Sequence, residues 1–441
     1  QIGAVAVAIQ APDDLDRVAV HVPGLELDRV DGGGWTREVE GFFLDLVVVG
    51  GAVHLPGLAT ARAPGKARTL PGHRPMARNC TAFSNPGRQE TRGGYARRVA
   101  RHDPGQALVI GFPGTEVPAR VRDALESGAL GGLILFKRNI ESPAQVHALL
   151  SGLRWPDDAP PLFAVDQEGG RVARLGAPVL RLPPMRELGR TESPERLETF
   201  GETLGRQLAA LGFTMDFAPV LDVDSNPANP VIGDRSFGDT AADVIRRALP
   251  FAAGLDAGGV LPCGKHFPGH GDTDVDSHLA LPRLRHERAR LETVELAPFR
   301  AAIAAGLPAL MSAHVLFDAL DPTVPATLSR RVMTELLRGE LGFEGVIVSD
   351  DLEMKAVADR WGIPDAAVLA IDAGCDVALI CSDVDAAFAA RDSLAARAAS
   401  DAAFADRLDQ ACERFLALRR RRPPRPAPAF TDDLFATENL R

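Results

Sequence analysis

The densest group of titratable side chains in the chain lies between Lys265 and His278. These fourteen residues hold three histidines, three aspartates and one lysine. The stretch also contains a proline and two glycines, which are incompatible with a regular helix, so we expect a loop. A solvated surface run would contain few histidines. A loop of this composition in an otherwise apolar chain is therefore a candidate site of catalysis.

Asp276 and His278 lie two residues apart near the end of this loop. In an extended segment, side chains with this spacing point to the same side. Asp276 could then orient the ring of His278 and fix its tautomer, forming a dyad that transfers a proton near neutral pH. A structural hydrogen bond is the competing interpretation, and the position of the pair in this loop favours catalysis.

A second pair of carboxylates, Asp350 and Asp351, ends a buried-strand pattern that begins at Val346. An aspartate in such a position can be a nucleophile, a general base or a metal ligand. One of the two could instead cap the helix that we expect over residues 352–360. The pattern alone does not separate Asp350 from Asp351.

Two further motifs combine charged side chains with glycine turns. Asp166 stands at a predicted strand end and is followed by two glycines and by Arg174, an arrangement that could form a polar clamp. Arg235 lies between two turn glycines and could present its planar guanidinium to a ligand. The alternatives are a tight turn with surface arginines and an arginine that pins its loop to a carbonyl.

We expect no catalytic metal and no cofactor. His266 and His270 are four residues apart, but Pro268 and Gly269 break the helix that would bring them to one face. The first predicted strand also lacks the HxH pair of metal-dependent barrel hydrolases. The five cysteines are scattered and form no CxxC pair, which indicates reduced thiols.

Eight short apolar runs, separated by helical patterns, would position these residues. The expected strands are residues 107–111, 132–136, 162–166, 214–218, 259–265, 309–314, 345–349 and 376–380. Ser142 and Ser193 each precede a proline, as N-caps do at helix starts. The pattern predicts an α/β fold with a single (β/α)8 TIM-type barrel. A doubly wound open sheet is the alternative, but the first strand lacks a GxGxxG turn.

The barrel prediction places the candidate residues together, because active sites in such barrels lie at the C-terminal ends of the strands. Polar residues follow five consecutive strands: Asp166 the third, Asp216 and Asp222 the fourth, Lys265 and His266 the fifth, His314 the sixth, and Asp350 the seventh.

We expect three segments: an N-terminal extension over residues 1–105, the catalytic barrel over 106–425 and a C-terminal tail over 426–441. Within the extension, the apolar runs 18–22 and 42–49 could be strands. The extension could be a small accessory domain, a disordered segment or a non-native stretch that is not naturally translated. We favour an extension without a catalytic role.

The net charge and the hydropathy of the chain indicate which classes of binding partner to expect. The net charge of −10 and the lack of a long basic stripe argue against a nucleic-acid partner. No run of eighteen apolar residues exists, so we expect no transmembrane helix. The first ten residues lack the basic region and cleavage site of a signal peptide. We expect a cytoplasmic monomer whose partner is a small molecule or oligosaccharide.

Four motifs together resemble the bacterial β-N-acetylglucosaminidases of glycoside hydrolase family 3, which act in peptidoglycan recycling. They are KHFPGHG with the following DSH, then DQEGGRVAR, GDRSFG and VIVSDDLEM. The resemblance runs from about residue 106 to about residue 420 and leaves out residues 1–105. Within the family, the chain resembles the members that lack a second α/β domain.

The resemblance implies a retaining, exo-acting enzyme that removes terminal β-linked N-acetylglucosamine from muropeptide fragments. Asp350 matches the nucleophile, His278 the general acid/base and Asp276 its dyad partner, with Asp351 as the competing nucleophile. The residues matching those that hold the sugar in the −1 subsite are Asp166, Arg174, Arg235, Lys265 and His266. The low aromatic content of 5% fits a small pocket better than a long polysaccharide cleft.

Other functions stay open at this point. A phosphorylase on the same scaffold would use phosphate in place of water, and a histidine acid/base permits this because it does not repel phosphate as a glutamate would. A different glycosidase such as a β-glucosidase is disfavoured by the Lys-His and DSH motifs. The alternatives from other classes are a non-catalytic sugar-binding protein and a metal-dependent barrel hydrolase.

Overall fold

The computed structural model describes residues 101–277, 280–435 and 437, together with short strands between residues 28 and 54. The chain divides into two compact units, Gln1–Gln89 and Glu90–Arg441. The following paragraphs treat each unit by itself, beginning with the smaller one.

The first unit contains a four-stranded antiparallel sheet in the order β1-β2-β5-β6. Its strands are β1 (Asp28–Val30), β2 (Gly34–Thr36), β5 (Leu46–Val49) and β6 (Ala52–His54), and a separate pair is formed by β3 (Glu38–Val39) and β4 (Phe42–Phe43). The run predicted as a strand over 42–49 thus contains two strands. The run predicted over 18–22 lies outside the described residues.

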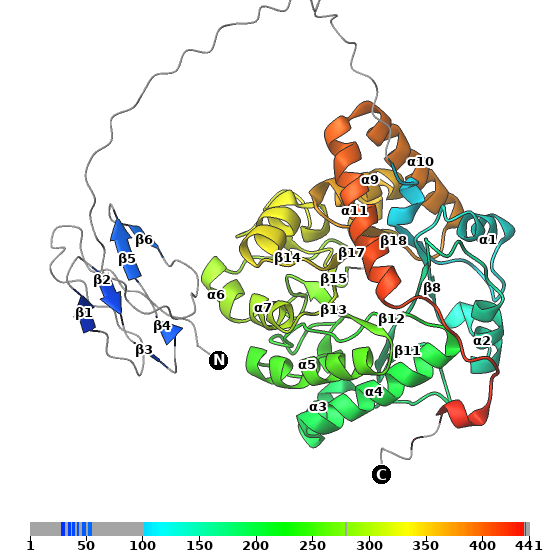
Figure 1. The fold of residues 1–441 in the computed structure, drawn as a ribbon, viewed down its shortest axis with the longest axis horizontal. Coiled ribbons are helices and arrows are strands. Elements are labelled where there is room, and N and C mark those ends of the chain that lie inside the picture. The colour runs from blue at the N-terminus through cyan, green and yellow to red at the C-terminus, as the bar shows by residue number, and fades with distance from the viewer. Residues whose placement is uncertain are drawn as a thin grey trace, which may run out of the picture. The chain divides into compact units, whose positions relative to one another are not determined.

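The second unit is a closed barrel of eight parallel strands, which confirms the predicted α/β barrel fold (Figure 1). In chain order the strands are β7 (Leu108–Ile110), β8 (Gly132–Leu135), β9 (Leu162–Val165), β12 (Met215–Asp216), β13 (Leu261–Phe267), β15 (Ala309–Ser312), β17 (Val346–Asp351) and β18 (Val377–Ile380). Each overlaps one predicted run. The ring closes where Ala378 of the last strand pairs with Leu108 of the first.

Helices surround the barrel in the sequence positions that the alternating pattern predicts (Figure 1). They are α1 (Ala119–Glu126), α2 (Pro143–Ser151), α3 (Met185–Thr191), α4 (Pro194–Leu211), α5 (Ala241–Ala257), α6 (Arg288–Thr293), α7 (Leu296–Ala304), the π-helix η6 (Arg331–Glu340), α8 (Lys355–Trp361), α9 (Ile363–Ala373), α10 (Val384–Ser400) and α11 (Ala402–Arg421). The Ser142 and Ser193 side chains accept hydrogen bonds from backbone N–H groups of α2 and α4, as expected of N-caps.

Helix α8 starts at Lys355, later than the helix predicted over 352–360. The side chain of Asp351 accepts a hydrogen bond from the Glu353 N–H at 3.1 Å, and the Met354 N–H bonds to the Asp351 carbonyl at 3.0 Å. These bonds hold a turn between the strand and the helix. As a result, β17 ends in two carboxylates that stand free of the helix.

Helix α11 closes the N-terminal end of the barrel. Phe415 and Leu418 pack against the side chains that fill the barrel interior, such as Val109. Arg419 is fully buried beside them and donates from one guanidinium nitrogen to the carbonyls of Gly131 and Pro160, at 3.1 and 3.2 Å. The apolar packing at this end leaves the opposite end, where the strands finish, for a binding site.

Some residues of the segment predicted as a C-terminal tail contact the barrel helices. The Ala427 N–H donates to the carbonyl of Ala210 at 2.8 Å, and Gln207 donates to the carbonyl of Phe435 at 3.3 Å. No helix in the described part of the chain has the length and apolarity that crossing a membrane requires.

Candidate active site

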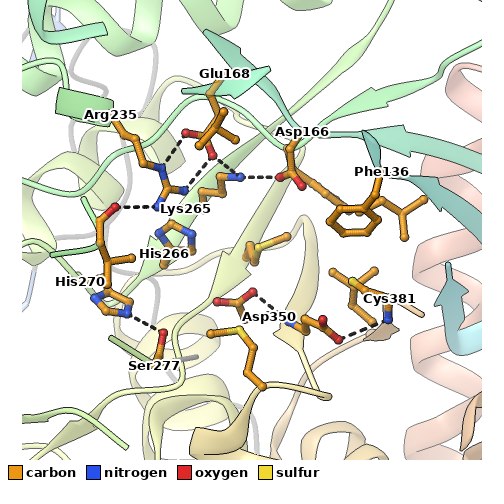
Figure 2. Close-up of a pocket in the computed structure, with 18 of the residues that line it drawn as sticks. Phe136, Asp166, Glu168, Arg235, Lys265, His266, His270, Ser277, Asp350 and Cys381 are labelled. Atoms are coloured by element: carbon orange, nitrogen blue, oxygen red, sulfur yellow. Dashed lines mark hydrogen bonds and ion pairs between the residues drawn. The ribbon is translucent and has the colours of Figure 1, made fainter. Parts of the chain in front are cut away.

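A cavity of about 230 Å³ opens at the C-terminal ends of the barrel strands (Figure 2). Seven of the eight predicted site residues line it: Asp166, Arg174, Arg235, Lys265, His266, Asp276 and Asp350. The eighth, His278, lies outside the described residues. These seven residues come from four strands (β9, β12, β13 and β17) and their following loops, so the side chains meet in one place, as the barrel prediction requires.

Charged groups crowd one wall of the cavity (Figure 2). Lys265, at the end of β13, donates from Nζ to Asp166 Oδ1 and lies 2.7 Å from Glu168 Oε1. Arg235 donates from Nε and a terminal nitrogen to the two carboxylate oxygens of Glu168, each at 2.8 Å. Arg174 completes the wall with a 3.2 Å contact to Asp166.

The local fold explains why these groups meet. Glu168 and Arg174 belong to a hairpin of β10 (Gln167–Gly169) and β11 (Val172–Ala173) that follows β9 directly. The side chain of Gln167 ties the hairpin together by accepting from the N–H groups of Arg174 and Leu175, at 2.8 and 3.0 Å. The loop that carries Arg235 is held through the Arg235 bond to the Val231 carbonyl at 3.1 Å.

The groups of this wall hold one another in their charged forms. Burial raises the pKa of Glu168, but the charges of Arg235 and Lys265 outweigh it and hold the pKa far below its usual range. The pKa of Asp166 is lowered in the same way by Lys265 and Arg174, against the effect of burial. The wall is therefore a fixed set of donors and acceptors, which suits the hydroxyl groups of a neutral ligand.

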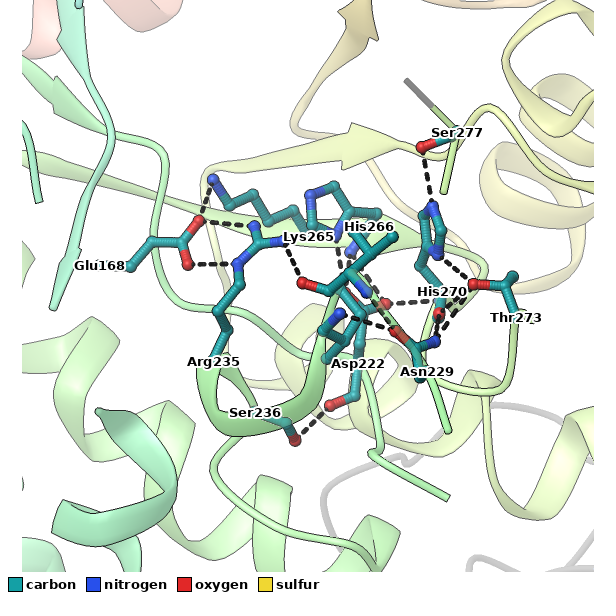
Figure 3. Close-up of polar contacts among 12 residues, drawn as sticks. Glu168, Asp222, Asn229, Arg235, Ser236, Lys265, His266, His270, Thr273 and Ser277 are labelled. Carbon is teal, nitrogen blue, oxygen red and sulfur yellow. Dashed lines mark hydrogen bonds and ion pairs between the residues drawn. The ribbon is translucent and has the colours of Figure 1, made fainter. Parts of the chain in front are cut away.

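His266 stands next to this wall and is oriented by Asp222 (Figure 3). Its Nδ1 lies 2.7 Å from Asp222 Oδ2, and its backbone N–H also donates to that carboxylate. Asp222 is completely buried, yet its interactions and hydrogen bonds with His266 and His270 hold its pKa below the usual range. This second carboxylate fixes the ring, so that Nε2 is the nitrogen left for a ligand.

Asp350 stands at the end of β17, across the cavity from the charged wall (Figure 2). Burial raises its pKa, but the neighbouring imidazoles of His314 and His266 and the Asp351 N–H, at 2.8 Å, outweigh it and hold the pKa below its usual value. Asp350 is therefore ionised at neutral pH. An ionised carboxylate on a rigid strand end is suited to nucleophilic attack.

Asp351 is in a different environment. Its Oδ1 accepts from the backbone N–H groups of Glu353 and Cys381, at 3.1 and 3.2 Å. Burial raises the pKa of Asp351 to about 7. Its hydrogen bonds join the end of β17 to the segments that follow β17 and β18, which is a structural role. The two neighbouring aspartates, indistinguishable in the sequence, thus differ in partners and in charge.

Several residues of the cavity were not singled out from the sequence. Glu168 belongs to a motif that was quoted but not assigned, and its place two residues after Asp166, on the same side of an extended segment, is the signal that could have identified it. The apolar residues of the cavity carry no polar signal at all; they include Ile134, Phe136, Phe217, Met311, Met354 and Leu379.

A parallel barrel with a small charged cavity and an ionised strand-end carboxylate is the architecture of a glycoside hydrolase. The chain belongs to glycosyl hydrolase family 3: residues 103–418 match the model of that family's N-terminal domain. This match confirms the resemblance seen in the sequence motifs.

Known relatives agree with this assignment. A protein named beta-hexosaminidase from Alkalilimnicola ehrlichii is 41% identical over 285 residues, which cover 63% of this chain and 81% of that protein. The solved family 3 β-N-acetylglucosaminidase from Paenibacillus sp. superposes with a TM-score of 0.72 at 41% identity, over 77% of this chain and 66% of that one. NagZ from Neisseria gonorrhoeae gives 0.60 at 34% identity, over 72% of this chain and 98% of that one.

Proposed function

We propose that this glycoside hydrolase is a retaining exo-β-N-acetylglucosaminidase that removes terminal β-linked N-acetylglucosamine, with muropeptide fragments of peptidoglycan as its substrate class. The names of the relatives support the sugar: they include beta-hexosaminidases, and one solved complex is of NagZ with N-trifluoroacetyl-D-glucosamine. The observation that carries the proposal is the ionised Asp350 at the floor of a cavity that also holds Asp276.

In the proposed mechanism, Asp350 attacks the anomeric carbon and forms a covalent glycosyl-enzyme, while the acid/base protonates the leaving oxygen. His278 has the acid/base role, and Asp276 orients it. Water then attacks the intermediate while the same dyad takes its proton. This second displacement at the anomeric carbon restores the original configuration. Asp350 needs no further activation because it is already ionised.

The charged wall would bind the sugar. Asp166, Arg174, Arg235, Lys265 and His266 offer both donors and acceptors to ring hydroxyls. The cavity of about 230 Å³ is smaller than the roughly 300–1,000 Å³ of sites for drug-sized ligands, which supports recognition of a single sugar residue. We further propose that the enzyme acts as a cytoplasmic monomer, which fractionation and size-exclusion chromatography test.

Hydrolysis of an aryl β-N-acetylglucosaminide in phosphate-free buffer tests the function. We expect wild type to turn over, and Asp350→Ala to lose about 10⁴-fold or more in kcat, the scale seen when a covalent nucleophile is removed. Asp351→Asn is the matched control and should stay within about tenfold of wild type. A wild-type enzyme that is inert until phosphate is added is instead a phosphorylase. Equal losses in the two variants would contradict the assignment of the nucleophile.

A further inference from the structure

The ring of His270 lies in the loop after β13 and has a hydrogen-bond partner at each nitrogen (Figure 3). Nδ1 lies 2.8 Å from Thr273 Oγ1, and Nε2 lies 3.0 Å from Ser277 Oγ. The residue is 1% exposed. Its backbone is fixed separately, because its N–H donates to Asp222 at 2.7 Å.

Both partners of the ring are hydroxyl groups, which can donate or accept, so either neutral tautomer keeps both hydrogen bonds. Thr273 Oγ1 also lies 3.1 Å from the His270 carbonyl and accepts from the Asn229 side chain at 3.2 Å. Burial and the nearby charge of His266 lower the pKa of His270 to about 4, in agreement with a neutral ring. A neutral ring with both nitrogens engaged is unsuited to act as the acid itself.

Ser277 connects two sides of the active site. Its hydroxyl bonds to His270, and its carbonyl accepts from the Ala356 N–H at 3.2 Å in α8, the helix that follows Asp350. The residue is 2% exposed and lines the cavity. In the chain it stands between the two members of the proposed dyad, Asp276 and His278.

We propose that His270 is a positioning residue, which through its hydrogen bond with Ser277 sets the place of Asp276 relative to Asp350. The inference rests on the proposed function, in which Asp276 orients the acid/base. Glycines at positions 269 and 271 let the loop backbone pass close to Glu295 and Val223, which fixes the start of the loop. The end of the loop needs fixed contacts of its own to hold a catalytic group within a fraction of an ångström. The Ser277 hydroxyl and carbonyl supply such contacts from opposite sides.

The test compares substrates whose leaving groups differ in how far they need protonation by the acid. Substrates with poor, alkyl leaving groups require protonation, whereas those with acidic phenols as leaving groups require almost none. We expect Ser277→Ala to lower kcat/KM about tenfold on an alkyl β-N-acetylglucosaminide and less than twofold on the most activated aryl one. The slope of log kcat/KM against leaving-group pKa should therefore steepen. A purely structural role would lower both rates equally.

Four further variants separate the positioning role from a general structural effect. Ser277→Thr keeps the hydroxyl and should restore the wild-type slope. His270→Asn should steepen the slope as Ser277→Ala does, and the double variant should add no more, because both remove one interaction. Asp274→Asn, at an exposed residue of the same loop, is the control that should leave the slope unchanged.

His278→Ala separates the inference from the function on which it rests. If that variant steepens the slope while Ser277→Ala and His270→Asn do not, the positioning role is wrong and the proposed function stands. If His278→Ala itself leaves the slope unchanged, the acid/base assignment is wrong and the inference falls with it. Thermal unfolding of every variant distinguishes an altered slope from a loss of folded enzyme.

Discussion

Replacing Glu168 by glutamine would remove the central negative charge of the cavity wall. Glu168 is 2% exposed and binds Arg235 through two hydrogen bonds, whereas Lys265 keeps Asp166 as a second partner. Arg235 would lose the charge pairing and one of its two side-chain acceptors, and would retain the Val231 carbonyl and the single glutamine oxygen. Breaking a buried pair from one side costs ~3–5 kcal/mol. Because glutamine keeps one acceptor oxygen and the shape of glutamate, we expect the free energy of unfolding to fall by the lower end of this range, about 3 kcal/mol.

Equilibrium unfolding in urea measures this loss, and steady-state kinetics measures its effect on the site. We expect KM to rise about tenfold, since Arg235 would be held less firmly against the cavity. The control is Asp234→Asn, which removes the partner of Arg171 in a pair whose side chains are about half exposed, at 49% and 47%. That variant should lose less than about 1 kcal/mol. A Glu168→Gln enzyme as stable as the control, with unchanged KM, would refute a wall held by charge pairing.

The same variant should change the pH dependence of stability. The folded-state pKa of Glu168 lies below the unfolded value of 4.5, so its contribution is complete above that pH and is lost as the pH falls further. Wild type should therefore lose stability between about pH 5 and pH 3 more steeply than Glu168→Gln does. Parallel profiles would contradict the charge pairing.

Two other predictions concern acidity and metals. Burial raises the pKa of Asp216 to about 8, and its Oδ2 has no hydrogen-bond partner among the described residues. Between the usual pKa of an aspartate and this raised value, the folded state binds a proton that the unfolded state has released, so wild type should lose stability as the pH rises from 4 to 8. Asp216→Asn has no such proton to lose and should lose less stability. Equilibrium unfolding of both proteins at pH 4 and pH 8 measures the difference. Prolonged treatment with a chelator should leave the hydrolysis rate unchanged; a loss restored by one divalent ion would contradict the metal-free mechanism.

The barrel and most of its cavity could be predicted because their signals are local. Each strand is a short apolar run, and parallel strands that end together bring the residues after them into one place. Asp166 and Lys265 could be placed in one cavity on this ground, since they stand at the ends of two strands of one barrel. Their 2.7 Å contact was not predicted, because β9 and β13 are not neighbours in the barrel.

The remaining features depend on contacts that no local pattern encodes. Asp350 and Asp351 are neighbours of one type and both accept from backbone N–H groups, so it is the imidazoles of His314 and His266 near Asp350 that separate them. The position of the His270 ring depends on the Thr273 and Ser277 hydroxyls, and the sequence marks both as ordinary loop residues. The exact start of α8 depends on the Asp351 turn in the same way.

The closure of the barrel by its last elements has a consequence for synthesis in the cell. Strand β7 has no partner on one side until β18 exists, and Phe415 of α11 fills the barrel end only afterwards. The chain between Leu108 and Phe415 is about 300 residues, which a ribosome makes in roughly 15–60 s. Throughout most of that interval the closing edge of β7 is unpaired and the barrel end is uncovered, so the nascent chain should depend on chaperones that shield these surfaces until the last helix emerges.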